Sequence, residues 1–182
     1  YNTQSEFETE QFALHLNRLI CEEMTATGKD GVMFLCIGTD RSTGDSLGPL
    51  IGHKLRGRRL AGAAVIGTLD KPVHAMNLDL YARYIKLHYP DYVVVAIDAS
   101  VGSPDHVGYA TLGRGALQPG LGVSKNLEAV GDISITGIVG GAGSRDPVML
   151  QSVRLSIVMK MADCICEGIC LVERLWDNAA II

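Results

Sequence analysis

Residues 32–50 read VMFLCIGTDRSTGDSLGPL, and this stretch joins a buried strand to a polar loop and then to a helix. The first six residues, 32–37, are continuously apolar, as expected of a central strand that helices cover on both faces. The loop from Gly38 to Gly44 is polar, and the helix is predicted from about Asp45 to Arg58. Because ligands bind at the carboxyl ends of strands in open α/β sheets, we expect a functional site at this loop.

The rest of the chain alternates between helical and strand patterns. Strands separated by helices pair in parallel and place helices on both faces of a sheet, and two successive strands near the end make the sheet mixed. The sequence therefore predicts an α/β fold, a three-layer αβα sandwich with a mostly parallel, mixed central sheet, as a single domain over residues 1–182. The other predicted helices are Glu6–Thr25, Asn77–His88 and one that Asp146-Pro147 opens and that runs to about Trp176; the other predicted strands are Ala63–Gly67, Tyr92–Ile97, Val107–Leu112 and Ile133–Val139.

The composition is typical of an ordinary globular domain. Hydrophobic residues make up 47% and charged residues 20% of the 182 residues, which argues against a disordered chain. A net charge of −4 argues against nucleic acid and anionic membranes as partners, and no apolar run approaches the ~20 residues of a membrane span. The odd number of cysteines, five, and the polar N-terminus without a secretory signal favour reduced thiols and a cytoplasmic location.

Two aspartates follow predicted strands. Asp98 directly ends the strand 92–97, and Asp45 follows the strand 32–37 after the polar loop. If these two strands are neighbours in the sheet, both carboxylates face one crevice at its carboxyl edge. Each aspartate also has an ordinary structural explanation, because Asp45 can cap a helix and Asp98 can accept hydrogen bonds from loop amides. The spacing alone leaves this choice open.

Paired carboxylates suit two kinds of chemistry. In the first, they share one proton and polarise a water molecule, because two close negative charges do not ionise together easily. Asp45 at a helix N-terminus then stays ionised, and Asp98, after an apolar strand, carries the proton. In the second, both carboxylates bind a divalent cation, which requires a third ligand.

Further polar groups are expected near the same edge of the sheet. Asp40 lies in the polar loop, and His74 follows the second predicted strand. Residues 140–144, GGAGS, could present backbone N–H groups to a carbonyl or phosphate, or could form a plain turn into the last helix. The sequence has no phosphate-binding loop, no zinc-binding histidine pair and no Cys-x-x-Cys, and nothing in it supports a serine triad.

Several motifs together resemble those of known families. Residues 36–50 look like the signature of the YyaC-type sporulation proteins of endospore-forming bacteria, and they are similar to the Asp-x-Leu-Gly-Pro of the spore germination protease. Ile97-Asp98-Ala99 resembles the second catalytic Asp-Ala of that protease, residues 118–126 resemble its Pro-Gly-x-Gly-Val loop, and residues 133–141 its next strand and glycine. The resemblance implies a three-layer, phosphorylase/hydrolase-like fold with Asp45 and Asp98 as catalytic residues.

A more distant resemblance is to the hydrogenase maturation proteases. Gly38, Asp45 and Gly48 keep that family's spacing of glycine, acidic ligand and glycine, and Gly67-Thr68 also fits. In that family the two acids bind a metal and a histidine completes the site, whereas the region 125–136 of this chain has no histidine. This difference predicts no metal and no cofactor, and it favours the mechanism of the germination protease.

Three functions are consistent with these motifs. The first is an endopeptidase that hydrolyses a spore protein inside the sporulating cell or spore, with Asp45 and Asp98 as an acid–base pair. The second is a non-catalytic sporulation protein that binds a peptide or partner in the same cleft, and the third is a metal-binding, maturation-type protease. The long last helix could bury a dimer face or simply cover the sheet, so a homo-oligomer remains open. The candidate substrate-binding residues are Asp40, Thr68, His74, Lys125, Asn126 and Gly141.

Overall fold

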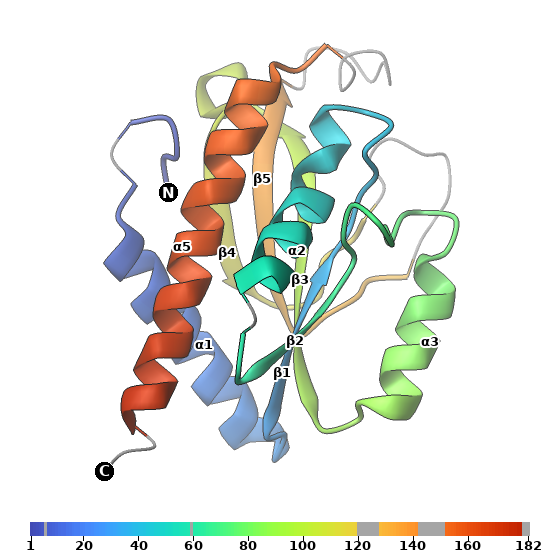
Figure 1. The fold of residues 1–182 in the computed structure, drawn as a ribbon, viewed down its shortest axis with the longest axis vertical. Helices are drawn as coiled ribbons and strands as arrows, with labels where there is room; N and C mark the ends of the chain where they lie inside the picture. The colour runs from blue at the N-terminus through green and yellow to red at the C-terminus, as the bar shows by residue number, and fades with distance from the viewer. Residues whose placement is uncertain (6, 59, 120–127, 142–151, 180–182) are drawn as a thin grey trace.

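The computed structural model describes residues 1–5, 7–58, 60–119, 128–141 and 152–179, which form a five-stranded sheet with helices on both faces (Figure 1). The strand order is β2-β1-β3-β5-β4, with β4 antiparallel to β5 and all other neighbours parallel. The predicted α/β sandwich with a mixed sheet is confirmed. The strands are β1 (Gly31–Cys36), β2 (Ala63–Ile66), β3 (Tyr92–Gly102), β4 (Ala110–Arg114) and β5 (Ile133–Gly141); the helices are α1 (Thr9–Thr27), α2 (Leu47–Arg58), α3 (Leu78–His88) and α5 (Leu155–Ala179), with short 3₁₀ turns η1 (Gly44–Ser46) and η2 (Pro104–His106).

Strand β1 lies in the interior of the sheet, between β2 and β3, and its side chains are apolar on both faces. Val32 and Phe34 pack into the larger core, and Met33 and Leu35 pack into a smaller core on the opposite face of the sheet. Every residue of β1 after Gly31 is buried. The continuous apolar run at the start of the quoted stretch thus lies where such a run can be buried on both sides.

The helices are divided unequally between the two faces of the sheet. Helices α1, α2 and α5 pack on one face and on one another, with the larger core beneath them (Figure 1). Helix α3 packs on the other face, over the smaller core. None of the helices within the described ranges is both long enough and apolar enough to cross a membrane.

Three element boundaries differ from the predictions. Strand β3 does not end at Ile97 but continues to Gly102, because β5 remains paired with it up to the pair Gly102–Gly141 after β1 has ended. Residues 107 and 108 form a turn after η2, so β4 begins at Ala110, later than expected. The predicted start of the last helix, Asp146-Pro147, lies outside the described residues, but residues 152–154 are not helical and α5 begins at Leu155.

Candidate active site

The carboxyl end of β1 meets the middle of β3, and Asp98 lies at this point. Cys36, the last residue of β1, pairs with Ile97, and the N–H of Ile37 donates to the carbonyl oxygen of Ile97 at 2.7 Å. Asp98 is therefore the first β3 residue beyond the paired length of β1, and its other neighbour is Thr136 of β5. The prediction that Asp98 ends its strand is wrong, but the expected adjacency of the two strands is confirmed, and it places Asp98 at the edge where β1 stops.

The polar loop after β1 is held in a fixed path that brings Asp45 back over the sheet. The N–H of Gly38 donates to the carbonyl of Val73 at 2.7 Å, and the N–H of Thr39 donates to the carbonyl of Asp45 at 3.0 Å. Gly38 has a φ of +140°, and a Cβ at this position would overlap the carbonyl oxygen of Asp45. Asp45 lies in the first turn of η1, which packs against β3, and not at the N-cap of α2.

The pKa values of both carboxyl groups are raised, and the charge of Asp45 contributes to the rise at Asp98. Burial raises the pKa of Asp98 to about 8; the Ala99 N–H, which donates to Oδ1 at 2.8 Å, lowers this pKa, and the charge of Asp45 raises it further. Burial also raises the pKa of Asp45, and the neighbouring Ser42 hydroxyl partly offsets this. Near neutral pH, a pKa of about 8 favours the protonated form of Asp98.

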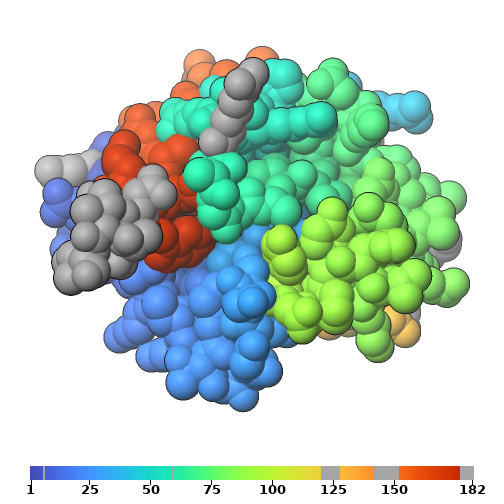
Figure 2. All heavy atoms as spheres, turned by 60° about the horizontal axis from the view of Figure 1, so that its bottom comes forward, coloured from blue at the N-terminus to red at the C-terminus, as the bar shows by residue number. Residues whose placement is uncertain are grey.

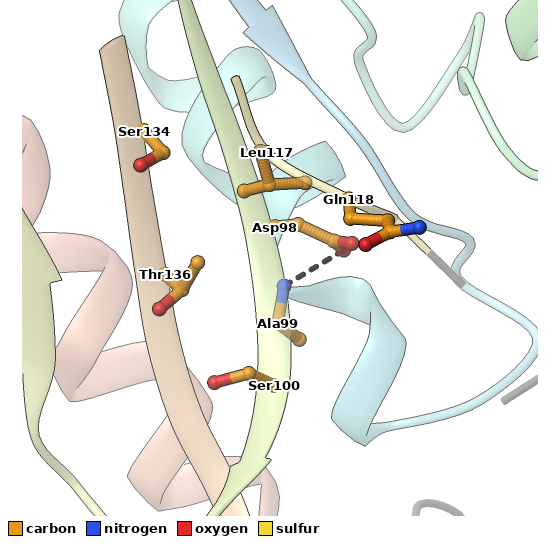
Figure 3. Close-up of a pocket in the computed structure, with 7 residues that line it drawn as sticks. All are labelled: Asp98, Ala99, Ser100, Leu117, Gln118, Ser134 and Thr136. Carbon is orange, nitrogen blue, oxygen red and sulfur yellow. Dashed lines mark hydrogen bonds between the residues drawn. The ribbon is translucent and has the colours of Figure 1, made fainter. Parts of the chain in front are cut away.

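A small polar pocket of about 160 Å³ opens beside Asp98 (Figure 3). Figure 3 shows that β3 and β5 contribute its polar wall, while the segment after β4 contributes Leu117 and Gln118. The hydroxyls of Ser100 and Ser134 make only long bonds of 3.4 Å to backbone carbonyls, so their oxygens can still accept hydrogen bonds. No cationic side chain is among the described residues that line this pocket. The pocket therefore suits a peptide group or a neutral polar side chain better than an acidic one.

Four of the predicted substrate-binding residues do not line this pocket. Thr68 is buried and accepts a hydrogen bond from the N–H of Lys71 at 3.2 Å, and Nδ1 of His74 accepts one from the N–H of Met76 at 3.2 Å, so both side chains hold turns. Asp40 is exposed on the loop. Gly141 pairs with Gly102, four residues along β3 from Asp98 and thus roughly 13 Å away at 3.3 Å per residue.

The remaining two predictions, Lys125 and Asn126, lie outside the described residues. Asp45 lies near enough to Asp98 for its charge to raise the pKa of that carboxyl group, but Asp45 does not line the pocket. The structure adds pocket residues that sequence reasoning missed: Ser100, Leu117, Gln118, Ser134 and Thr136. Two of these had a signal in the sequence, because Ser134 and Thr136 alternate with the buried Ile133 and Ile135 and so share one face of a strand.

A metal site at the aspartate pair would need at least one more protein ligand. Within the described ranges, no three side chains of His, Cys, Asp or Glu gather at one point. The donor set that the structure describes does not fit a metal-binding site of the maturation-protease type.

One buried hydroxyl beside the pair lacks a partner. The Oγ atom of Ser42 is buried, and among the described residues it has no hydrogen-bond partner of good geometry, although it lies close enough to Asp45 to lower the pKa of that carboxyl group. A buried hydroxyl without a partner costs about 1–3 kcal/mol of stability. This cost is relieved when a water molecule or a substrate group binds there, so the hydroxyl is a candidate binding group.

Comparison with known proteins gives a family, a sequence relative and a structural neighbour. The family model described as "Protein of unknown function (DUF1256)" matches residues 4–168. The chain is 47% identical over 150 residues to the uncharacterized protein YyaC of Bacillus subtilis (strain 168), a match that covers 82% of this chain and 72% of that protein. This confirms the resemblance to the YyaC-type proteins, whereas the link to the germination protease stays a prediction.

The structural neighbour is the [NiFe] hydrogenase maturation protease HycI from Thermococcus kodakarensis KOD1. The two structures superpose with a TM-score of 0.55, and the match covers 87% of this chain and 98% of the other. Their sequences are 17% identical, so the likeness shows a shared fold and nothing about shared residues.

Proposed function

Because the chain belongs to the family described as "Protein of unknown function (DUF1256)" and has the fold of a hydrogenase maturation protease, we propose that it is a peptidase whose acid–base pair is Asp45 and Asp98. The observation that carries this proposal is that two partly buried carboxyl groups from different elements lie close enough for the charge of Asp45 to raise the pKa of Asp98. The charge of Asp45 contributes to a pKa of about 8 at Asp98, so the pair retains one proton at neutral pH. A site that holds one carboxylate and one carboxylic acid side by side can take a proton from water and give one to a carbonyl oxygen.

The first step adds water to the scissile peptide bond. The water oxygen attacks the carbonyl carbon, and one water proton passes to the ionised Asp45. The proton of Asp98 passes at the same time to the carbonyl oxygen, so a neutral tetrahedral diol forms between a protonated Asp45 and an ionised Asp98. Because the Ala99 N–H occupies Oδ1 of Asp98, we assign this proton to Oδ2.

The second step breaks the carbon–nitrogen bond. Asp45 returns its proton to the departing nitrogen, and Asp98 removes a proton from one hydroxyl of the diol, which becomes the new carboxyl group. Both aspartates end in the protonation states in which they began, so the cycle needs no further co-reactant.

Two groups beside the pair are suited to hold the reactants. The buried hydroxyl of Ser42 can donate a hydrogen bond to the attacking water or the substrate next to Asp45. The pocket lined by Ser100, Thr136 and Gln118 can hold one neutral polar side chain of the peptide next to Asp98. A polar side chain loses its hydrogen bonds to water when it enters the pocket. The hydroxyl and amide groups of the pocket wall can replace these bonds, so they favour such a side chain.

The biological substrate that we propose is a protein of the sporulating cell or spore. The support for this is the resemblance of residues 36–50 and of Asp98-Ala99 to motifs of the spore germination protease. We therefore also propose that the protein acts inside the sporulating cell or spore.

The test is to incubate the full chain with spore protein extract and with a mixed peptide library, and to identify new peptide termini by mass spectrometry. We expect new termini with the natural chain and none with Asp45→Asn, because an amide cannot accept the proton of the attacking water. Asp105→Asn, which changes an exposed carboxylate on η2, is the matched control and should cleave normally. Undiminished cleavage by Asp45→Asn would refute the assignment.

The pH dependence offers a second prediction at the same pair. The value of kcat/KM should fall above about pH 8 as Asp98 loses its proton, and should fall in acid as Asp45 gains one. In Asp45→Asn the pKa of Asp98 should decrease, because one cause that raises it has been removed, yet it should stay above its ordinary value because burial remains. Carbon-13 NMR titration of the carboxyl group measures this directly, and an unchanged pKa would show that the two groups do not interact.

The alternative is a protein that binds a peptide in the same pocket without cleaving it. It is favoured by the small number of polar groups that the described residues place beside the pair. The two functions separate when no new termini appear with the natural chain but labelled peptides still bind to it and to Asp98→Asn. That result would leave a binding protein and exclude the peptidase.

A further inference from the structure

Helix α3 carries a stripe of large apolar side chains that face away from the sheet. Met76, just before the helix, is 73% exposed, and within the helix Leu80 is 69%, Tyr84 46% and Leu87 74% exposed. Within the helix, spacings of four and three residues place Leu80, Tyr84 and Leu87 on one side, and Met76 lies in the turn before it. Isolated exposed apolar residues are ordinary, but three in one stripe with a fourth in the adjoining turn call for a partner.

The attachment of α3 to its own sheet is light. Of its eleven residues only Leu78 and Ile85 are buried, and no other helix within the described ranges lies over the core on this face (Figure 1). The atoms of α3 and of the turn after it, yellow-green in Figure 2, stand at the surface of the molecule. A helix that is apolar on two opposite sides is normally buried on both sides. The outer side of α3 is therefore suited to bind another protein surface.

Charged residues beside the stripe are arranged with opposite signs at its two ends. Asp79 and Lys86 are seven residues apart, close to two full turns, so they lie on the same flank of the helix about 10 Å apart along its axis. Within the part of the chain that the structure describes, neither forms an ion pair. Arg83 lies between them on the same side.

We propose that α3 pairs antiparallel with α3 of a second copy of this chain, across a two-fold axis beside Ala82 and Arg83. In this arrangement Leu80 of each copy packs against Tyr84 of the other, and Met76 packs near Leu87 of the other. A two-fold axis perpendicular to both helices keeps the charged flanks on the same side. Asp79 of each copy therefore faces Lys86 of the other, and two identical ion pairs form.

The charge pattern is the reason to choose a second copy as the occupant. A two-fold interface must be complementary to itself, and a stripe with an acidic residue at one end and a basic residue at the other meets this condition only when the helices run in opposite directions. Opposite directions also align the helix dipoles favourably. The two Arg83 side chains approach each other at the axis, where each also lies near Asp79 of the other copy, which limits their repulsion.

The size of the interface sets its expected strength. One helix face per copy is small beside the roughly 800 Å² per partner of a stable complex, so the dimer should be weak and should dissociate on dilution.

Sedimentation velocity of the full chain over a wide range of concentrations measures the strength of the dimer. Leu80→Glu should weaken the dimer at least about tenfold, because a central apolar anchor is replaced by a charge. Leu14→Glu changes a leucine on α1 that is also largely exposed, so it is the control and should not weaken the dimer.

Charge reversal tests the antiparallel register itself. Asp79→Lys alone and Lys86→Asp alone should each be monomeric, because each places like charges opposite one another twice. The double variant should dimerise again, because both charges are exchanged and every pair is again of opposite sign. An equal mixture of the two single variants should also dimerise, because the lysine pair of one chain then faces the aspartate pair of the other. Circular dichroism confirms that the variants are folded. A natural chain that stays monomeric, a dimer that Leu80→Glu leaves intact, or single variants that do not rescue one another would each overturn the proposal.

Discussion

Asp98→Asn is expected to abolish peptide hydrolysis and to stabilise the protein at the same time. The amide can neither give a proton to the carbonyl oxygen nor recover one from the diol, so kcat/KM should fall by about a thousandfold or more. The amide has nearly the shape of the carboxyl group, and its oxygen can still accept the hydrogen bond from the Ala99 N–H. The structure around the site should therefore be kept, and mass spectrometry of the digestion products gives the loss of activity.

The gain in stability follows from the raised pKa of Asp98. In the folded protein this carboxyl group titrates at about 8, whereas in the unfolded chain it titrates near 3.9. The folded state therefore binds the proton more tightly, and the free energy of unfolding falls as the pH rises from about 4 to about 8. Asparagine has no charge to bury, so at pH 8 we expect Asp98→Asn to be more stable than the natural chain by about 2 kcal/mol.

Urea unfolding at pH 5 and at pH 8 measures this difference. The advantage of Asp98→Asn should be large at pH 8 and small at pH 5, where Asp98 of the natural chain is protonated in the folded state. Asp105→Asn, on the exposed η2, should show no such pH-dependent gain. A variant that is less stable than the natural chain at pH 8, or that still cleaves, would remove Asp98 from its assigned role.

Gly52→Ala should be among the most destabilising single substitutions in the chain. Gly52 lies on the buried side of α2, and a Cβ there would overlap the carbonyl oxygen of Gly67 and press on the Cβ of Cys36. Gly67 cannot easily move away, because its φ is +88° and its own hydrogen atoms face the carbonyl of Cys36. Overpacking against fixed backbone should cost about 3 kcal/mol, although alanine is the better helix former.

Gly57→Ala is the matched control for this effect. It makes the same substitution five residues further along the same helix, where a Cβ would meet no atom within 4 Å. It should leave stability unchanged or raise it by up to about 1 kcal/mol. Urea midpoints of the two variants give the comparison, and equal midpoints would show that α2 does not need the close approach at Gly52. Because η1 leads directly into α2, a shift of this helix should also lower activity through Asp45.

Much of the secondary structure was predictable because it is encoded over short distances. The continuous apolar run 32–37 predicts a strand buried on both faces, and the mixed spacing of three and four apolar residues predicts α1 and α3 nearly to their ends. The alternation of strands and helices predicts parallel pairing, which the order β2-β1-β3 confirms. The aspartate pair could be named because each carboxylate follows an apolar strand and matches a motif.

Other features depend on residues that are far apart in the chain. The prediction placed Asp98 at the end of its strand, but β3 continues because β5, some 35 residues later, supplies hydrogen bonds up to Gly102. The pocket beside Asp98 exists only because β5 and the segment after β4 lie next to β3. Thr68 and His74 were expected at the site, but their hydrogen bonds hold turns.

Local periodicity and glycine or aspartate motifs are properties of neighbouring residues, so the sequence was enough to predict the order of helices and strands and to propose Asp45 and Asp98 as site residues. The sequence also suggested which of the two carboxyl groups carries the proton, but not how far the pKa of Asp98 rises, because that depends on how much water the folded chain removes and on how near the charge of Asp45 comes. The exposure of the apolar stripe on α3 likewise depends on the tertiary structure. Its leucines look like core residues in the sequence, and only the packing of the sheet shows which of them no other element covers.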